Sequence, residues 1–183
     1  MKKGLIIIDM LVRDVKNRKD KDMLIKNQLN LIAAFNKSKQ PVILTGARKD
    51  GRTLGKNPNP IMLKLWGNEE SKNSEENKLV PELLSSNYNY YIDKSGYSAF
   101  FKTKLEKICK KEKIKELYLC GISAGVCVYF TGVDASMRKI MPFLVIDASG
   151  SPSAKTHNRN ITNFREILGS TISTRELMRK IIK

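Results

Sequence analysis

Short, unbroken runs of aliphatic residues are the sequence feature that most constrains the fold of this chain. The first run, Leu5–Ile8, has no polar alternation, and Val42–Leu44 and Phe143–Ile146 follow the same pattern. Such a run is typical of a strand that is covered on both faces, which favours a parallel sheet. Further strands are predicted at Tyr88–Asp93, Glu116–Gly121 and Thr171–Ile172.

Segments with helical spacing of apolar residues lie between the predicted strands. Asp22 can cap a helix whose apolar positions include Ile25, Leu29 and Ile32. Further helices are predicted over Ala99–Lys113, Val126–Ile140, Ser153–Leu168 and Thr174–Ile182. Because strands and helices alternate, we expect residues 1–183 to form one α/β domain, a three-layer αβα sandwich with a mainly parallel central sheet. A barrel of eight such units would need a longer chain.

Charge and hydropathy narrow the class of protein. The 34 Lys and Arg residues exceed the 18 Asp and Glu residues, which gives a net charge of +16 and an attraction for polyanions. A non-enzymatic nucleic-acid-binding domain is therefore one alternative, although the lysines are spread along the chain without an aromatic-interleaved basic stripe. No apolar run approaches the roughly 20 residues that span a bilayer. The odd number of cysteines, three, favours a reducing environment, so we expect a cytoplasmic protein. The hydropathy predicts no membrane partner, and the spread of the lysines predicts no specific nucleic acid partner.

Reactive side chains stand at the predicted ends of several strands. In an open parallel sheet, ligands bind beyond the carboxyl ends of the strands. Asp9 ends the first strand, Asp93 and Lys94 end the third, and Asp147 ends the fifth. Cys127 follows the fourth strand after a loop of small residues. Together, acid, ammonium and thiol favour nucleophilic chemistry, in which a carboxylate takes the thiol proton and a lysine stabilises the anion.

Cys127 by itself allows two interpretations. At the start of a helix, unpaired N–H groups and the helix dipole favour a thiolate, so the pKa of Cys127 is expected to fall. The same N–H groups can bind an oxyanion. A free cysteine is also commonly a small buried hydrophobic residue, which suits Cys109 and Cys120 better. Similarly, a carboxylate in the position of Asp9 can simply cap a turn.

Three sequence motifs occur in a fixed order along the chain. They are Leu5–Met10, Asp93–Phe100 and Gly121–Val128. In this order they resemble the motifs of the isochorismatase-like cysteine hydrolases, which include nicotinamidases and N-carbamoylsarcosine amidase. The resemblance extends through Thr131, Asp134-Ala135 and Val145–Ala148, and it includes His157 and Thr171–Thr174. It therefore spans nearly the whole chain.

The resemblance implies a triad of Asp9 as general base, Lys94 as electrostatic partner and Cys127 as nucleophile. It also implies a cis peptide bond at Ile122-Ser123, which would direct the backbone N–H groups of Ser123 and Cys127 at a substrate oxygen. The implied reaction is attack on a small amide or carbamoyl (ureido) carbonyl, loss of ammonia or an amine through a thioester, and hydrolysis.

The resemblance also places an aromatic contact for substrate at Trp66, although a single tryptophan in a long loop can equally pack into the core. Tyr97, in the second motif, is a further candidate for substrate binding. The loop after the first acid, Met10–Asp14, departs from the family's usual residues, which puts its substrate contacts in doubt. Family members commonly form dimers or larger assemblies, so a homo-oligomer is expected.

A second departure concerns the metal that nicotinamidases of the family hold with an Asp-x-His motif and a later histidine. The corresponding stretches, Thr45–Arg48 and Leu65–Glu69, contain no histidine, and the one histidine of the chain is His157. We therefore expect no metal site and no cofactor. Arg48 and Glu69 can pair where the metal would be, or they can be exposed loop residues. An alternative within the family is hydrolysis of the vinyl ether of isochorismate, which needs no nucleophilic cysteine.

Overall fold

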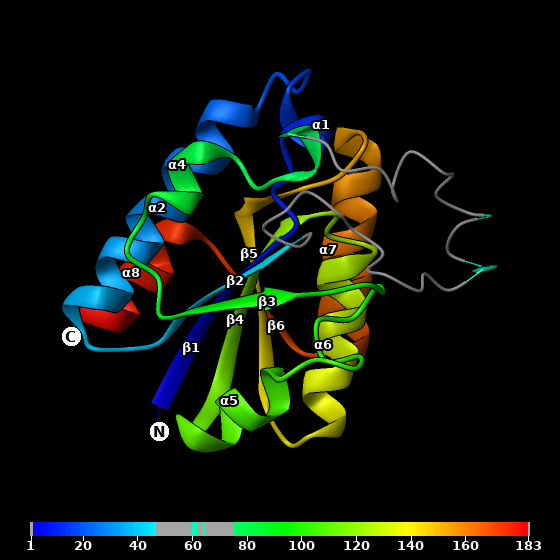
Figure 1. Ribbon diagram of the computed structural model, residues 1–183. Helices are drawn as coiled ribbons and strands as arrows, with labels where there is room; N and C mark the ends of the chain where they lie inside the picture. Colours follow the sequence, from blue (N-terminus) through cyan, green and yellow to red (C-terminus); the bar gives the residue numbers. More distant parts are fainter. Residues whose placement is uncertain (1, 47–59, 62–63, 65–74, 183) are drawn as a thin grey trace.

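The computed structural model describes residues 2–46, 60–61, 64 and 75–182 (Figure 1). Within these residues, six parallel strands form one sheet in the order β3-β2-β1-β4-β5-β6. The strands are β1 Lys2–Ile8, β2 Val42–Gly46, β3 Tyr90–Asp93, β4 Ile114–Ile122, β5 Met141–Gly150 and β6 Ser170–Ile172. Their parallel arrangement confirms the predicted sheet.

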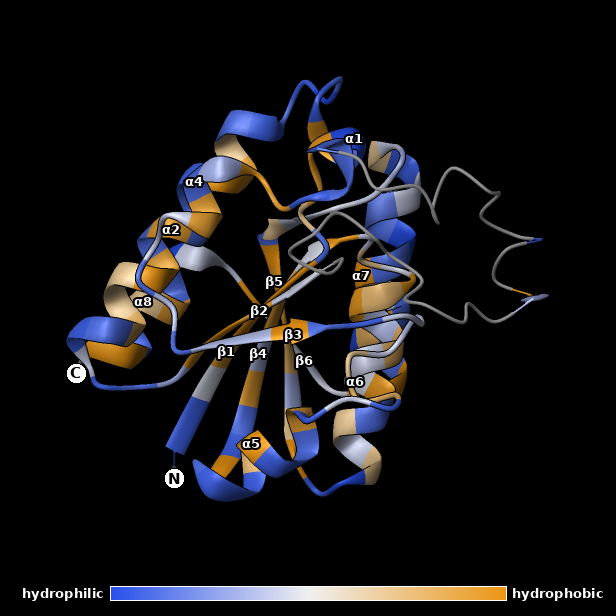
Figure 2. Ribbon diagram, in the orientation of Figure 1, coloured by the Kyte–Doolittle hydropathy of each residue, from blue (hydrophilic) through white to orange (hydrophobic). Residues whose placement is uncertain are grey.

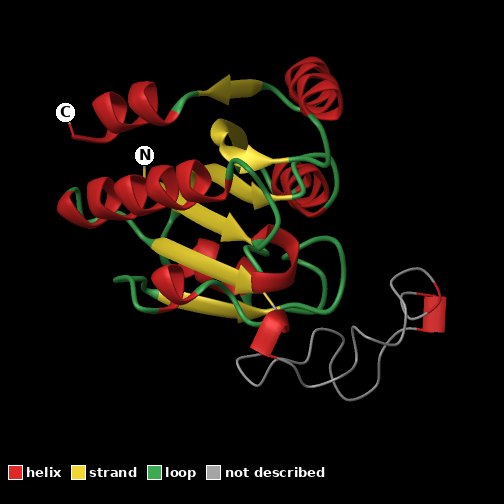
Figure 3. Ribbon diagram, turned by 90° about the horizontal axis from the view of Figure 1, so that it is seen from above, coloured by secondary structure: helices red, strands yellow, loops and turns green. Residues whose placement is uncertain are grey.

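Helices cover both faces of the sheet (Figures 1 and 3). The helices are α1 Val12–Val15, α2 Lys21–Lys37, α4 Pro81–Leu84, α5 Leu105–Lys111, α6 Cys127–Met137, α7 Ala154–Ile167 and α8 Thr174–Ile182, with a 3-10 helix η2 at Glu75–Asn77. The apolar residues of α2 and α8 pack on one face, and those of α5, α6 and α7 pack on the other. The predicted three-layer αβα sandwich is confirmed. In the described part of the chain, no helix combines the length and the apolar character needed to cross a membrane.

The first strand explains why an unbroken aliphatic run belongs at the centre of this sheet. Successive side chains of a strand point to opposite faces. Leu5 and Ile7 therefore enter the core beneath α2 and α8, whereas Ile6 and Ile8 enter the core beneath α5, α6 and α7. All four are fully buried, because both faces of β1 are covered. Figure 2 shows this concentration of hydrophobic residues along the central strands.

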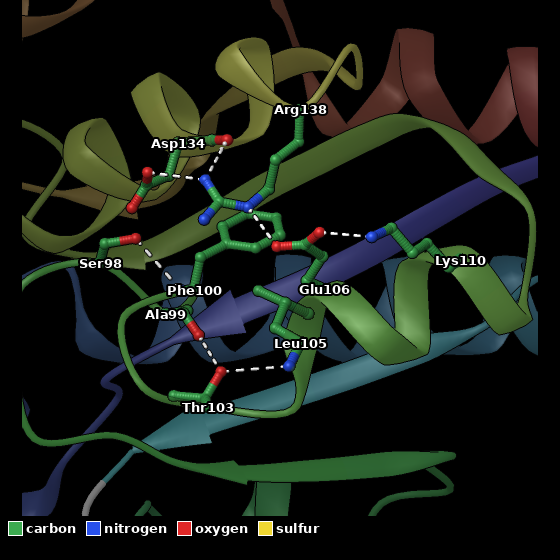
Figure 4. Close-up of polar contacts among 9 residues, drawn as sticks. All are labelled: Ser98, Ala99, Phe100, Thr103, Leu105, Glu106, Lys110, Asp134 and Arg138. Carbon is green, nitrogen blue, oxygen red and sulfur yellow. Dashed lines mark hydrogen bonds and ion pairs between the residues drawn. The ribbon is translucent and has the colours of Figure 1, made fainter.

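The helix predicted over Ala99–Lys113 is wrong in its first part, because α5 begins only at Leu105. The residues before it form turns in which hydroxyl groups replace the helical hydrogen bonds (Figure 4). Ser98 Oγ accepts from the N–H of Phe100, and Thr103 Oγ1 accepts from the N–H of Leu105. Short polar side chains commonly compete with a helix in this way.

Two carboxylates also have roles that differ from the prediction. Helix α2 begins at Lys21, so Asp22 lies inside the first turn and does not cap it. Strand β5 continues to Gly150, so Asp147 does not end that strand. The Asp147 carboxylate instead accepts hydrogen bonds from the N–H and the hydroxyl of Thr174, at 2.7 and 2.8 Å, and so stabilises the start of α8.

Near its carboxyl end, strand β4 contains an irregularity with a backbone conformation that favours glycine. Gly121 has a φ of +118°, and a Cβ atom there would lie 2.0 Å from the carbonyl oxygen of Ile8 on β1. Because Gly121 has no side chain, the backbones of β1 and β4 lie close together at the carboxyl ends of both strands. This close approach brings the residues after β1 near those after β4.

We predict that Gly121→Ala lowers the free energy of unfolding by roughly 3 kcal/mol or more, because it adds both a strained φ and a backbone clash. Gly169→Ala is the matched control, since Gly169 also has a positive φ of +134° but its Cβ would meet only the Met141 sulfur at 3.5 Å. We expect that control to lose about 1 kcal/mol. Urea denaturation measures both values, and equal losses would contradict the close approach of β1 and β4.

Candidate active site

The carboxyl edge of the sheet brings together Asp9, Lys94 and Cys127, which are far apart in the sequence. Asp9 follows β1, Lys94 follows β3, and Cys127 begins α6 after β4. Lys94 Nζ lies 2.7 Å from Asp9 Oδ2 and 3.5 Å from Cys127 Sγ. Because β2 lies between β1 and β3, these strands are separated by roughly 10 Å, and the long lysine side chain spans much of that distance.

The ammonium group of Lys94 uses all three of its hydrogen-bond donors. Besides Asp9 and Cys127, it contacts the carbonyl oxygen of Gly96 at 2.7 Å. The residue is only 7% exposed. Burial opposes the charge, but the Asp9 carboxylate and the Cys127 sulfur outweigh that cost and raise the pKa of Lys94. The site therefore holds a fixed positive charge at neutral pH.

Asp9 occupies an uncommon backbone conformation where β1 ends. Its φ is +51°, a region that few residues other than glycine adopt but that aspartate tolerates better than most. Its N–H donates to the carbonyl of Thr45 at 3.0 Å, so β2 holds the turn in place. The residue is 9% exposed. Conformations of this kind often occur at functional sites, and here the turn carries the carboxylate that binds Lys94.

Cys127 holds its proton in the free protein, so the predicted low pKa is wrong. Burial and the nearby Asp9 charge together raise the pKa of Cys127 to about 12, against a smaller lowering effect of Lys94. The position at the start of α6 does not overcome these two effects. The Asp9 carboxylate and the thiol both contact the Lys94 ammonium, at 2.7 and 3.5 Å. The arrangement therefore places a carboxylate, which can accept a proton, and a cation in the same site as the thiol.

The loop before α6 leaves the backbone N–H groups of Ser123 and Cys127 available in the same turn as the thiol. The N–H groups of Val126 and Val128 both donate to the carbonyl of Ser123, at 3.0 and 3.2 Å, and Ala124 donates to Gly150 at 2.8 Å. Among the residues that the structure describes, the N–H groups of Ser123 and Cys127 have no hydrogen-bond partner. The peptide bond Ile122-Ser123 is cis. Two such donors can stabilise a negatively charged oxygen.

The other residues that the sequence suggests for the site lie apart from this group of three side chains or outside the described residues. Tyr97 follows the Gly96 carbonyl that binds Lys94, and its ring stacks on Phe130 of α6 with 5.5 Å between the ring centroids. Trp66, Arg48 and Glu69 lie outside the described residues. The Gly96 carbonyl was missed in the sequence, because the glycine gives no signal that its oxygen binds an ammonium group.

The single histidine does not take part in this site. His157 Nε2 donates to the carbonyl of Ile146 at 3.0 Å, and Nδ1 lies 3.2 Å from Ser151 Oγ, so the ring connects α7 to β5 and to the residue that follows it. Within residues 2–46, 60–61, 64 and 75–182, no group of three or more His, Cys, Asp or Glu side chains is placed to hold a metal ion.

Comparison with known proteins identifies a family and related sequences. A family model described as Isochorismatase domain matches residues 3–176. Enterobactin synthase component B of Escherichia coli strain K12 is 30% identical over 114 residues, which make up 62% of this chain and 40% of that protein. The match thus spans less than half the length of that curated relative.

Solved structures share the fold over nearly the whole chain. A cysteine hydrolase from Pseudomonas syringae pv. phaseolicola 1448A has a TM-score of 0.88 at 18% identity, covering 98% of this chain and 92% of that chain. N-carbamoylsarcosine amidase from Thermoplasma acidophilum has a TM-score of 0.80 at 23% identity, covering 94% and 96%. At these identities the likeness shows that the architecture is shared.

We predict that Asp9→Asn makes Cys127 more reactive toward iodoacetamide. The negative charge of Asp9 raises the pKa of Cys127, so its removal lowers that pKa and increases the thiolate fraction below it. We expect alkylation at pH 8 to become about tenfold faster or more, which corresponds to a fall of one pKa unit. Mass spectrometry of the Cys127 peptide measures the rate.

Asp93→Asn is the matched control, because the exposed Asp93 precedes Lys94 directly in the sequence. Its alkylation rate is expected to stay within about twofold of the unmodified chain, a change of less than a third of a pKa unit. Slower alkylation of Asp9→Asn would contradict the electrostatic description of the site.

Proposed function

The chain belongs to the isochorismatase family, and we propose that it is a cysteine-dependent amidohydrolase that cleaves a small amide or carbamoyl (ureido) substrate. One observation carries this proposal. The Lys94 ammonium contacts both the Asp9 carboxylate, at 2.7 Å, and the Cys127 sulfur, at 3.5 Å, so one cation holds the acid and the thiol beside each other. A nucleophile, its base and a charge that stabilises the resulting anion are the parts that nucleophilic catalysis at a carbonyl needs.

In the first half of the proposed reaction, Asp9 accepts the thiol proton while the sulfur of Cys127 attacks the substrate carbonyl carbon. The carbonyl oxygen becomes an oxyanion and accepts hydrogen bonds from the N–H groups of Ser123 and Cys127. The carbon–nitrogen bond then breaks, and protonated Asp9 gives its proton to the departing ammonia or amine. The product of this half is a thioester on Cys127, and Asp9 is again a carboxylate.

In the second half, Asp9 accepts a proton from a water molecule that attacks the thioester. A second oxyanion forms at the same pair of N–H groups, the carbon–sulfur bond breaks, and the sulfur regains a proton from Asp9. Lys94 remains charged throughout, because its pKa is raised. Its ammonium group stabilises the sulfur anion when it leaves and holds Asp9 beside it.

We further propose that this reaction needs no metal ion. The stretch Thr45–Arg48, which begins with the last two residues of β2, contains no histidine, and His157 is engaged with Ile146 and Ser151. A substrate of this enzyme would then be oriented by the N–H groups and by side chains such as Tyr97. Assembly into a homo-oligomer and a cytoplasmic location stay predictions.

A second candidate activity is hydrolysis of a vinyl ether such as that of isochorismate. The family description itself favours it. This chemistry proceeds by protonation of the double bond and does not need a nucleophilic sulfur, so the two activities differ in their dependence on Cys127. The close thiol–carboxylate–ammonium arrangement favours the amide reaction.

We predict that Cys127→Ala lowers kcat for a cleaved amide or ureide by at least about a thousandfold, because no thioester can form. Cys109→Ala is the control, since Cys109 is a buried cysteine of α5, and its kcat is expected to stay within about threefold of the unmodified chain. Ammonia or amine release from a panel of small amides and ureides measures the activity, with and without a metal chelator.

The same panel separates the alternatives. Asp9→Asn is expected to lose hydrolysis even though its thiol is more reactive, because the leaving nitrogen has no proton donor. Equal activity of the unmodified chain and Cys127→Ala on every cleaved amide would overturn the proposal. Isochorismate cleavage that survives in Cys127→Ala would support the vinyl ether reaction, and loss of activity with chelator would refute metal independence.

A further inference from the structure

We infer that Thr131 is a positioning residue that holds the Cys127 sulfur within reach of Lys94. The inference rests on the site described above and adds a residue to its function. Thr131 lies on α6, one turn after Cys127, and is fully buried. Its Oγ1 donates to the carbonyl of Cys127 at 2.7 Å and accepts from the N–H of Ala99 at 3.0 Å.

The direction of these two bonds follows from the chemistry of a hydroxyl group. A threonine hydroxyl has one proton, and a carbonyl oxygen can only accept, so that proton belongs to the bond with Cys127. Bonds of this kind to the carbonyl four residues earlier are common for threonine in helices. The less usual feature is the second bond, in which the N–H of a separate loop donates to the same oxygen.

That second bond links the helix of the thiol to the loop of the ammonium group. Ala99 lies three residues after Gly96, whose carbonyl binds the Lys94 ammonium. The loop between them is supported internally, because Ser98 Oγ accepts from Phe100 N–H and Thr103 Oγ1 donates to the carbonyl of Ala99 (Figure 4). Movement of Ala99 relative to α6 would therefore move Gly96 and its hydrogen bond to Lys94.

The contacts thus form a closed ring. It runs from Cys127 through Thr131, Ala99 and Gly96 to Lys94, and returns to the Cys127 sulfur over 3.5 Å. This last contact is the longest of the ring, and the effect of Lys94 on the sulfur decreases with distance. Loss of the Thr131 hydroxyl opens the ring opposite this contact and frees the sulfur to move away from Lys94.

Helix α6 is joined a second time, at its carboxyl end, to the segment that contains the Ala99 loop and α5. Arg138 follows α6, and its Nε contacts Glu106 of α5 at 2.9 Å. Its guanidinium group also contacts Asp134 and lies over the ring of Phe100, 4.8 Å from the centroid (Figure 4). This connection does not touch Cys127, Lys94 or Gly96. A change at Arg138 therefore weakens the packing of α6 against α5 and the loop without opening the ring.

The test is the rate of Cys127 alkylation by iodoacetamide between pH 7 and 10, followed by mass spectrometry of the Cys127 peptide. Thr131→Val keeps the shape and removes the hydroxyl, and we expect alkylation at pH 8 to slow about tenfold, as for a rise of one pKa unit. Thr131→Ser restores the hydroxyl and is expected to react within about threefold of the unmodified chain, less than half a pKa unit. Thr131→Ala replaces Thr131→Val in the comparison with Thr131→Ser if the valine variant does not fold.

Arg138→Gln is the control for a merely structural effect. We expect it to lower the melting temperature while the pH profile of alkylation stays that of the unmodified chain. An unchanged profile in Thr131→Val, or an equal slowing in Arg138→Gln, would overturn the inference. Because no substrate is used, the result is independent of the amide panel. If no amide of the panel is cleaved but Thr131→Val shifts the pH profile of alkylation, the proposed function is refuted and the role of Thr131 remains supported.

Discussion

The buried ammonium group of Lys94 is the contact on which the candidate site depends. It is joined at once to a carboxylate, a carbonyl and a sulfur that come from three different parts of the chain. A buried charge without partners would be expensive, so Asp9 and Gly96 are required for the stability of the site as well as for its geometry. The parallel sheet provides this arrangement, because the carboxyl ends of β1, β3 and β4 lie along one edge.

Much of the fold follows from local patterns in the sequence. The unbroken run Leu5–Ile8 predicts a strand covered on both faces, and the structure buries Leu5 and Ile7 on one side and Ile6 and Ile8 on the other. Element boundaries are less predictable where side chains compete with the backbone. The hydroxyls of Ser98 and Thr103 delay α5 to Leu105, although the apolar spacing alone predicts an earlier start.

The candidate site was predictable in its residues but not in its electrostatics. Strand ends and motif order indicated Asp9, Lys94 and Cys127, and the structure brings their side chains together. The direction of the Cys127 pKa shift was not predictable, because it depends on burial and on the distance to Asp9, neither of which is encoded near Cys127. The Gly96 carbonyl and the bond between Thr131 and Ala99 were missed for the same reason, since both depend on contacts between distant segments.

A protonated resting thiol changes how a nucleophile of this kind can work. A free thiolate would be reactive before substrate arrives, whereas here the sulfur keeps its proton because burial and Asp9 together outweigh Lys94. A substrate carbonyl can stabilise the negative charge that forms when the thiol loses its proton. When the sulfur attacks, this charge moves to the carbonyl oxygen, which two backbone N–H groups can bind. The proton then moves to the Asp9 carboxylate, which shares the Lys94 ammonium with the sulfur. In this description, Lys94 stabilises the charge in the transition state and orients its two partners, and the nucleophile becomes strong only when a substrate can accept its electrons.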